Sequence, residues 1–133
     1  MRHKALTFIA AGLAFLSVAI PVAAHHSIAA AFDVRKAVTL KGTITEIVWT
    51  NPHIYFFMDV NLGGQVEPWV VEGGAPNSLH VRGWRQDSLK PGDTVTVAGW
   101  QAKDGSHLVN SSSVTLEDGM TLYTEASDIF GKW

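Results

Sequence analysis

The chain has no cysteine among its 133 residues, and this absence excludes two kinds of chemistry. Without thiolates there is neither a disulfide nor a cysteine-ligated zinc site. Stability therefore depends on packing, and metal ligands must come from histidines, carboxylates or a free N-terminus.

Other functional signatures are also missing. The sequence contains no phosphate-binding glycine-rich motif, nucleophile elbow, His-Glu-x-x-His pair or nucleotide fingerprint, so no enzyme class is indicated. Basic residues are not in excess either, since 10 Lys and Arg stand against 12 Asp and Glu. Nucleic acid is therefore not an expected partner, because binding to phosphate backbones relies on Lys and Arg.

The N-terminus resembles an export signal. Arg2 and Lys4 precede an apolar run over 5–20, and Val22-Ala23-Ala24 places small residues at a cleavage site. The run is short for a membrane-spanning helix, which needs about 20 residues. We therefore predict a signal peptide over 1–24, a periplasmic or secreted protein and no stable membrane anchor after cleavage. An uncleaved anchor is the alternative.

The mature chain is expected to fold as one domain between two short terminal segments. We predict an N-terminal arm at 25–37, a β-domain at 38–123 and a C-terminal tail at 124–133. Alternating apolar residues and turn signals predict the strands; these lie at 38–49, 54–62, 67–72, 94–101 and 107–116, with a possible edge strand at 120–123.

Two local features shape the predicted fold. The apolar phase slips within the first strand between Ile44 and Ile47, which predicts a bulge, and Gly42 allows a close approach. Between the third and fourth strands, Pro76 and Gly83 bracket a short helix. The order of elements predicts an all-β fold with one short helix, namely a small OB-like Greek-key barrel of five strands, with a β-sandwich as the alternative.

Several motifs together resemble a known family. They are His25-His26-Ser27, Leu40-Lys41-Gly42, Trp49-Thr50-Asn51-Pro52-His53, Trp69-Val70-Val71-Glu72, Gly83-Trp84, Leu89-Lys90-Pro91-Gly92-Asp93 and Asp104-Gly105. The pattern is similar to a family of small exported bacterial proteins known as a domain of unknown function. The resemblance implies export and a small β-barrel-like domain, and it implies no activity or cofactor.

Cleavage at the predicted site would create an N-terminus that can bind a metal ion. A cut after Ala24 would begin the chain at His25, whose amine and imidazole can chelate one metal, with His26 adding a second ring. A cut after Ala23 would begin Ala-His-His, a spacing suited to square-planar copper or nickel. Imidazole ligands favour copper, nickel and zinc, and copper is the expected cofactor. The alternative is a solvated linker.

His53 is the best candidate for an additional ligand. It follows Asn51-Pro52 at the start of the second strand, where a turn would hold the ring rigidly. Glu72 is a candidate acceptor for a histidine N–H, as metal sites often require. The alternatives are an imidazole bonded to the backbone and an ordinary strand carboxylate.

A second set of residues points to a ligand other than a metal. Tyr55 and Phe57 lie on the opposite face of their strand from the apolar series, so they can form a binding platform. The loops carrying His53 and His107 would flank that face in an OB-fold, although a surface turn also explains His107. The sequence thus predicts an exported binding protein for copper, or alternatively for a small ligand, a glycan or a periplasmic protein.

Overall fold

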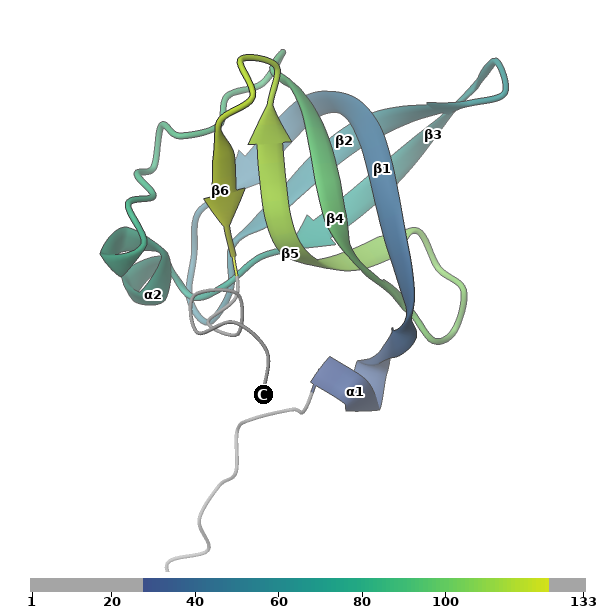
Figure 1. Ribbon diagram of the computed structural model, residues 1–133, viewed down its shortest axis with the longest axis horizontal. Coiled ribbons are helices and arrows are strands. Elements are labelled where there is room, and N and C mark those ends of the chain that lie inside the picture. The colour runs from purple at the N-terminus through teal and green to yellow at the C-terminus, as the bar shows by residue number, and fades with distance from the viewer. Residues whose placement is uncertain (1–27, 125–133) are drawn as a thin grey trace, which may run out of the picture.

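The computed structural model describes residues 28–124, which form one mostly antiparallel sheet with short helices beside it (Figure 1). Within that range, no helix has the length and apolar character needed to cross a membrane. The elements in chain order are α1 (Ile28–Ala31), β1 (Phe32–Val48), β2 (Tyr55–Leu62), β3 (Gln65–Glu72), α2 (Pro76–Val81), β4 (Thr94–Ala102), β5 (Leu108–Leu116) and β6 (Thr121–Tyr123).

The strand pairings run in a ring. The order across the sheet is β3-β2-β1-β4-β5-β6, and a parallel pairing between β3 and β5 joins strands from its two sides. Five strands are thereby linked in a circle, as a small barrel requires, and β6 adds to β5 at the edge. The predicted all-β fold with a short helix between the third and fourth strands is confirmed.

The ring encloses a core built from alternating residues. In β2, Phe56, Met58 and Val60 are at most 1% exposed. Tyr55 and Phe57, which alternate with them along the strand, are half-buried on the other face. The remaining core residues come from every part of the ring and from the α2 segment; they include Leu40, Ile44, Ile54, Trp69, Val71, Leu79, Trp84, Leu89, Val95, Val97, Val109 and Val114.

The first strand is long and bent, as its slipped apolar phase predicts. Its register with β2 shifts between Ile44 and Glu46, which confirms the bulge. Gly42 is buried where the strand pairs on both sides, and a Cβ there would lie 2.6 Å from Met58 Cε. The strand begins at Phe32 and not at the predicted residue 38. The residues between Phe32 and Ala37 are mostly polar, so the alternation of apolar residues does not extend to the start of the strand.

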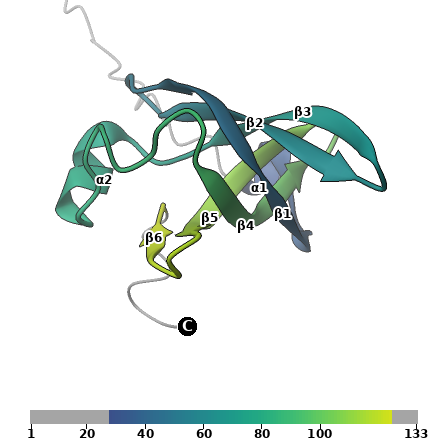
Figure 2. The same cartoon turned by 90° about the horizontal axis from the view of Figure 1, so that it is seen from above.

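Helix α2 and strand β6 lie together, far from the tip of the β2–β3 hairpin (Figure 2). The Trp84 indole is 1% exposed, and its Nε1 donates to the Tyr123 carbonyl at 2.9 Å. His80 Nδ1 lies 3.1 Å from the Trp84 carbonyl oxygen. These contacts connect α2, the segment around Trp84 and the end of β6.

The start of the described chain is fixed to the β4–β5 turn. The backbone N–H of Lys103 donates to the Ala31 carbonyl at 2.9 Å, and its ammonium contacts the Ala29 carbonyl. The turn itself contains Gly105 with φ 79°, which suits the predicted Asp-Gly turn. Helix α1 therefore lies beside this turn.

Candidate functional site

On the side of β2, β3 and β5 that points away from the core, two rows of buried or half-buried side chains lie next to each other, and we call this surface the outer face. Residues paired across neighbouring strands project to the same side of a sheet. The register aligns one polar row and one apolar row in this way; they consist of Tyr55, Glu72 and Asn110, and of Phe57, Val70 and Leu108. This face is the one on which the sequence predicted Tyr55 and Phe57.

His53 lies two residues before Tyr55, ahead of β2, and its side chain is held by Glu72. The His53 Nδ1 is 2.6 Å from Glu72 Oε1, the distance of a short hydrogen bond. The next residue, Ile54, is fixed by backbone hydrogen bonds with Gly73 and Gly74 at 2.9 and 3.1 Å. The imidazole therefore sits on an anchored backbone, and its Nε2 is the nitrogen left for a ligand.

The environment of Glu72 makes this pair electrostatically unusual. Its side chain is 13% exposed, while that of His53 is 44% exposed. Burial raises the pKa of Glu72, and the charge and hydrogen bond of His53 lower it in part. Burial also raises the pKa of Tyr55, with a further contribution from the Glu72 carboxylate. The site thus combines a poorly solvated carboxylate with a phenol that keeps its proton.

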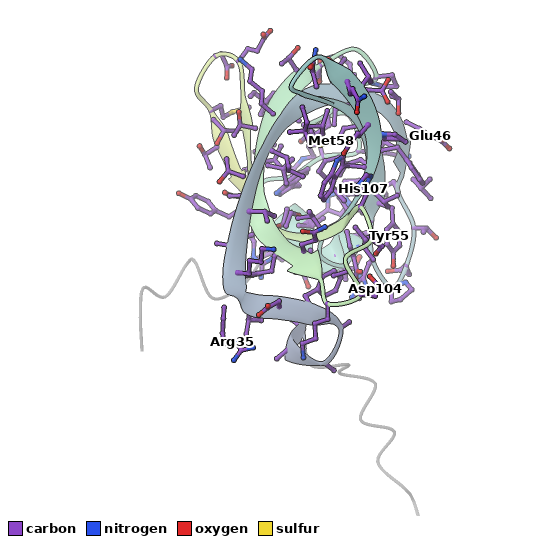
Figure 3. The ribbon with its side chains drawn as sticks, turned by 90° about the vertical axis from the view of Figure 1, so that its right-hand side faces the viewer. Arg35, Glu46, Tyr55, Met58, Asp104 and His107 are labelled. Carbon is purple, nitrogen blue, oxygen red and sulfur yellow. The ribbon has the colours of Figure 1, made fainter. Side chains whose placement is uncertain are left out.

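His107 belongs to a different cluster. Its ring stacks on Trp69 with centroids 4.5 Å apart and an angle of 10°, and its Nε2 lies 3.4 Å from Glu67 Oε2. Glu67 and Trp69 project to the opposite face of β3 from Glu72, because side chains alternate along a strand. In Figure 3, His107 lies within the outline of the ring of strands. The structure therefore does not bring His107 together with His53 on the outer face.

The proposed N-terminal ligands His25 and His26 lie outside the described residues. Among residues 28–124, no three histidine, cysteine, aspartate or glutamate side chains gather closely enough to hold a metal ion. Of the three proposed metal ligands, His53 lies within the described residues, and the other ligands would have to come from outside them.

Asn110 is the residue that sequence reasoning missed. It is 8% exposed, and its Oδ1 is buried with no hydrogen-bond partner within the described chain. It pairs in register with Glu72, which puts both side chains on the outer face. An asparagine inside a strand was the available signal, because this residue is depleted in strands. A buried acceptor without a donor calls for an explanation.

A family model matches residues 13–110, which is most of the chain. It describes a family of unknown function (DUF6152). A search of curated proteins finds no match.

Proposed function

Because the chain belongs to this family of unknown function, we propose its function from the site itself: an exported protein that binds copper through its processed N-terminus. The ligands are His25 and His26, with His53 as the additional ligand and Glu72 as the acceptor that orients it.

The observation that carries the proposal is the 2.6 Å contact between His53 Nδ1 and Glu72 Oε1. A metal-ligating histidine usually donates its second ring N–H to a carboxylate or carbonyl, which fixes the tautomer and the ring. Here Nδ1 carries that hydrogen bond, so Nε2 is the coordinating nitrogen. The arrangement supports His53 as a ligand prepared before the metal arrives.

The position of α1 supports the participation of the N-terminus. Hydrogen bonds to Lys103 hold this helix at the end of β4, and only β5 lies between β4 and β3. Two interstrand spacings of ~4.8 Å place those strands roughly 10 Å apart. Each residue before Ile28 can add ~3.3 Å of reach, so an arm that begins at α1 is long enough to cover the distance to β3, which carries Glu72.

The donor set favours copper. A terminal amine and imidazole nitrogens suit divalent copper, which also forms the most stable complexes in the first-row series. Ordering the arm costs conformational entropy, and metal coordination offsets that cost.

The test begins with natively processed protein, whose N-terminus is verified by mass spectrometry. We expect the double variant His25→Ala with His26→Ala to lose tight copper binding, and His53→Ala to weaken it by about tenfold or more. Glu72→Gln should weaken it by about tenfold, within the range seen when outer partners of metal ligands are altered.

His107→Gln is the matched control, because it removes an imidazole near a carboxylate in a different cluster. It should bind copper like the parent. If the double variant binds as tightly as the parent while both retain their β-sheet circular dichroism, the N-terminus is not the site.

A second candidate function is a metal-independent binding module on the outer face. Tyr55 and Phe57 have half-buried rings on this face, and Asn110 Oδ1 has no hydrogen-bond partner in the described part of the chain; both features favour this function. Its ligand would be a small molecule, a glycan or a periplasmic protein held by these residues.

A further inference from the structure

The outer face offers hydrogen-bond acceptors without matching donors. Glu72 Oε1 is occupied by His53, which leaves Oε2 free of any ion pair within residues 28–124. Asn110 Oδ1, on the adjoining strand, is buried and has no hydrogen-bond partner among those residues. The two residues are paired in register, so their backbones lie ~4.8 Å apart. A ligand that contacts both must bring N–H or O–H donors.

The charge at this place is negative and poorly solvated. The Glu72 side chain is 13% exposed, and within residues 28–124 the basic group that contacts it is the His53 imidazole. No lysine or arginine of that range forms an ion pair with Glu72. A cationic ligand would therefore meet a carboxylate whose charge is incompletely balanced.

The neighbouring row has the opposite character. Phe57, Val70 and Leu108 are paired across β2, β3 and β5 and are half-buried. They form an apolar strip directly beside the polar row, at the distance of two residues along each strand, ~6.6 Å. A ligand lying along the strands would thus place one end on acceptors and the other on apolar side chains.

We propose that the outer face binds a small organic ammonium ion, with its nitrogen between Glu72 and Asn110 and its apolar body on Phe57, Val70 and Leu108. An ammonium carries three donors and no acceptor, which matches two acceptors in adjacent strands. Its charge complements Glu72, and hydrogen bonds to a charged group are stronger than neutral ones. This proposal rests on the second candidate function and gives its ligand a chemical class.

The experiment compares phenethylamine with phenethyl alcohol, which has the same ring and chain but a neutral hydroxyl. Both are titrated into the processed protein in excess chelator and followed by two-dimensional amide NMR. We expect phenethylamine to bind about tenfold more tightly, since a hydrogen bond from its charged ammonium to the Glu72 carboxylate is stronger than one from a neutral hydroxyl. Its shifts should map to the backbone around Tyr55, Val70 and Asn110.

Two variants that each remove one negative charge distinguish binding at this site from a general electrostatic attraction of the amine to the protein. Glu72→Gln should abolish the preference for the amine. Glu46→Gln should retain the preference. Glu46 lies on β1 at the border of the same face, where it pairs with Phe57, but it is exposed and lies outside the row that contains Glu72 and Asn110. Equal affinities for both probes, equal effects of the two variants, or shifts confined to another face would overturn the proposal.

The chelator keeps this outcome independent of copper. The double variant of His25 and His26 should bind phenethylamine like the parent, so loss of copper binding leaves the amine result intact. Tighter binding of the neutral alcohol would instead identify a hydroxylated ligand on this face and reject the ammonium.

Discussion

Glu72 is the residue on which most of the chemistry depends. It terminates β3, pairs with Tyr55 on one side and with Asn110 on the other, and contacts His53. His53 stabilises the charged form of Glu72, whereas burial disfavours it. A carboxylate in such surroundings serves either to orient an imidazole or to attract a cation, and both proposals use it.

The raised pKa of Glu72 predicts a pH dependence of stability. A carboxyl that holds its proton more tightly in the folded state stabilises the protein most below its unfolded pKa, ordinarily 4.5. That contribution is lost as the pH rises through the folded value. Urea unfolding of the parent and Glu72→Gln should therefore show the parent losing stability relative to the variant over this interval.

The control repeats the comparison in a His53→Gln background. The imidazole lowers the pKa of Glu72, so its removal should enlarge the pH effect. A difference between parent and Glu72→Gln that stays constant with pH would contradict the argument.

At the scale of single elements, the β2–β3 hairpin shows how turn chemistry sets register. Gly63 and Gly64 both have positive φ, at 62° and 90°, the conformation that two-residue hairpin turns require. The Gly64 N–H donates to Asn61 Oδ1 at 3.0 Å. The turn fixes the pairing of Tyr55 with Glu72 at the other end of the hairpin.

Substitutions at Gly63 test that role. Gly63→Val should destabilise the fold by about 1–2 kcal/mol, because a side chain branched at Cβ is strongly disfavoured in a left-handed backbone. Gly63→Asn should remain close to the parent, since asparagine tolerates this conformation. No other atom lies within 4 Å of a Cβ at this position, so the comparison isolates backbone strain. Equal stabilities of the two variants in urea unfolding would contradict it.

At the scale of the whole molecule, the ring of strands creates the outer face. The β3–β5 pairing brings Glu72 next to Asn110, although 38 positions separate them in the sequence. The fixed α1 then connects the domain to the N-terminal segment. A free histidine at the start of that segment would require cleavage of the predicted signal peptide after Ala24.

We predict that the protein expressed with its own leader appears in the periplasmic fraction with His25 or Ala24 as its first residue. Intact-mass and N-terminal peptide analysis of that fraction measures this directly. A chain that begins at Met1 and sediments with membranes would contradict both the signal peptide and the free histidine ligand.

Much of the fold was predictable because its signals are local. Alternation in β2, the slipped phase of β1 and the proline and glycine around α2 each reflect neighbouring residues, and the structure has all three features. The early start of β1 was not predictable, because its first residues are mostly polar and show no alternation of apolar and polar side chains. The candidate site was predictable in part: His53 and Glu72 were identified as separate candidates, whereas Asn110 was missed.

The sequence by itself determined the existence and order of the strands, the turns between them, the buried face of β2 and the absence of thiol chemistry. These follow from side-chain alternation, backbone freedom and composition. Tertiary structure decided which polar groups meet. It placed His53 against Glu72, Glu72 beside Asn110 and His107 against Trp69 on the other side of β3. Closing the ring requires β3 to pair with a strand far along the chain, and no local pattern encodes that partner.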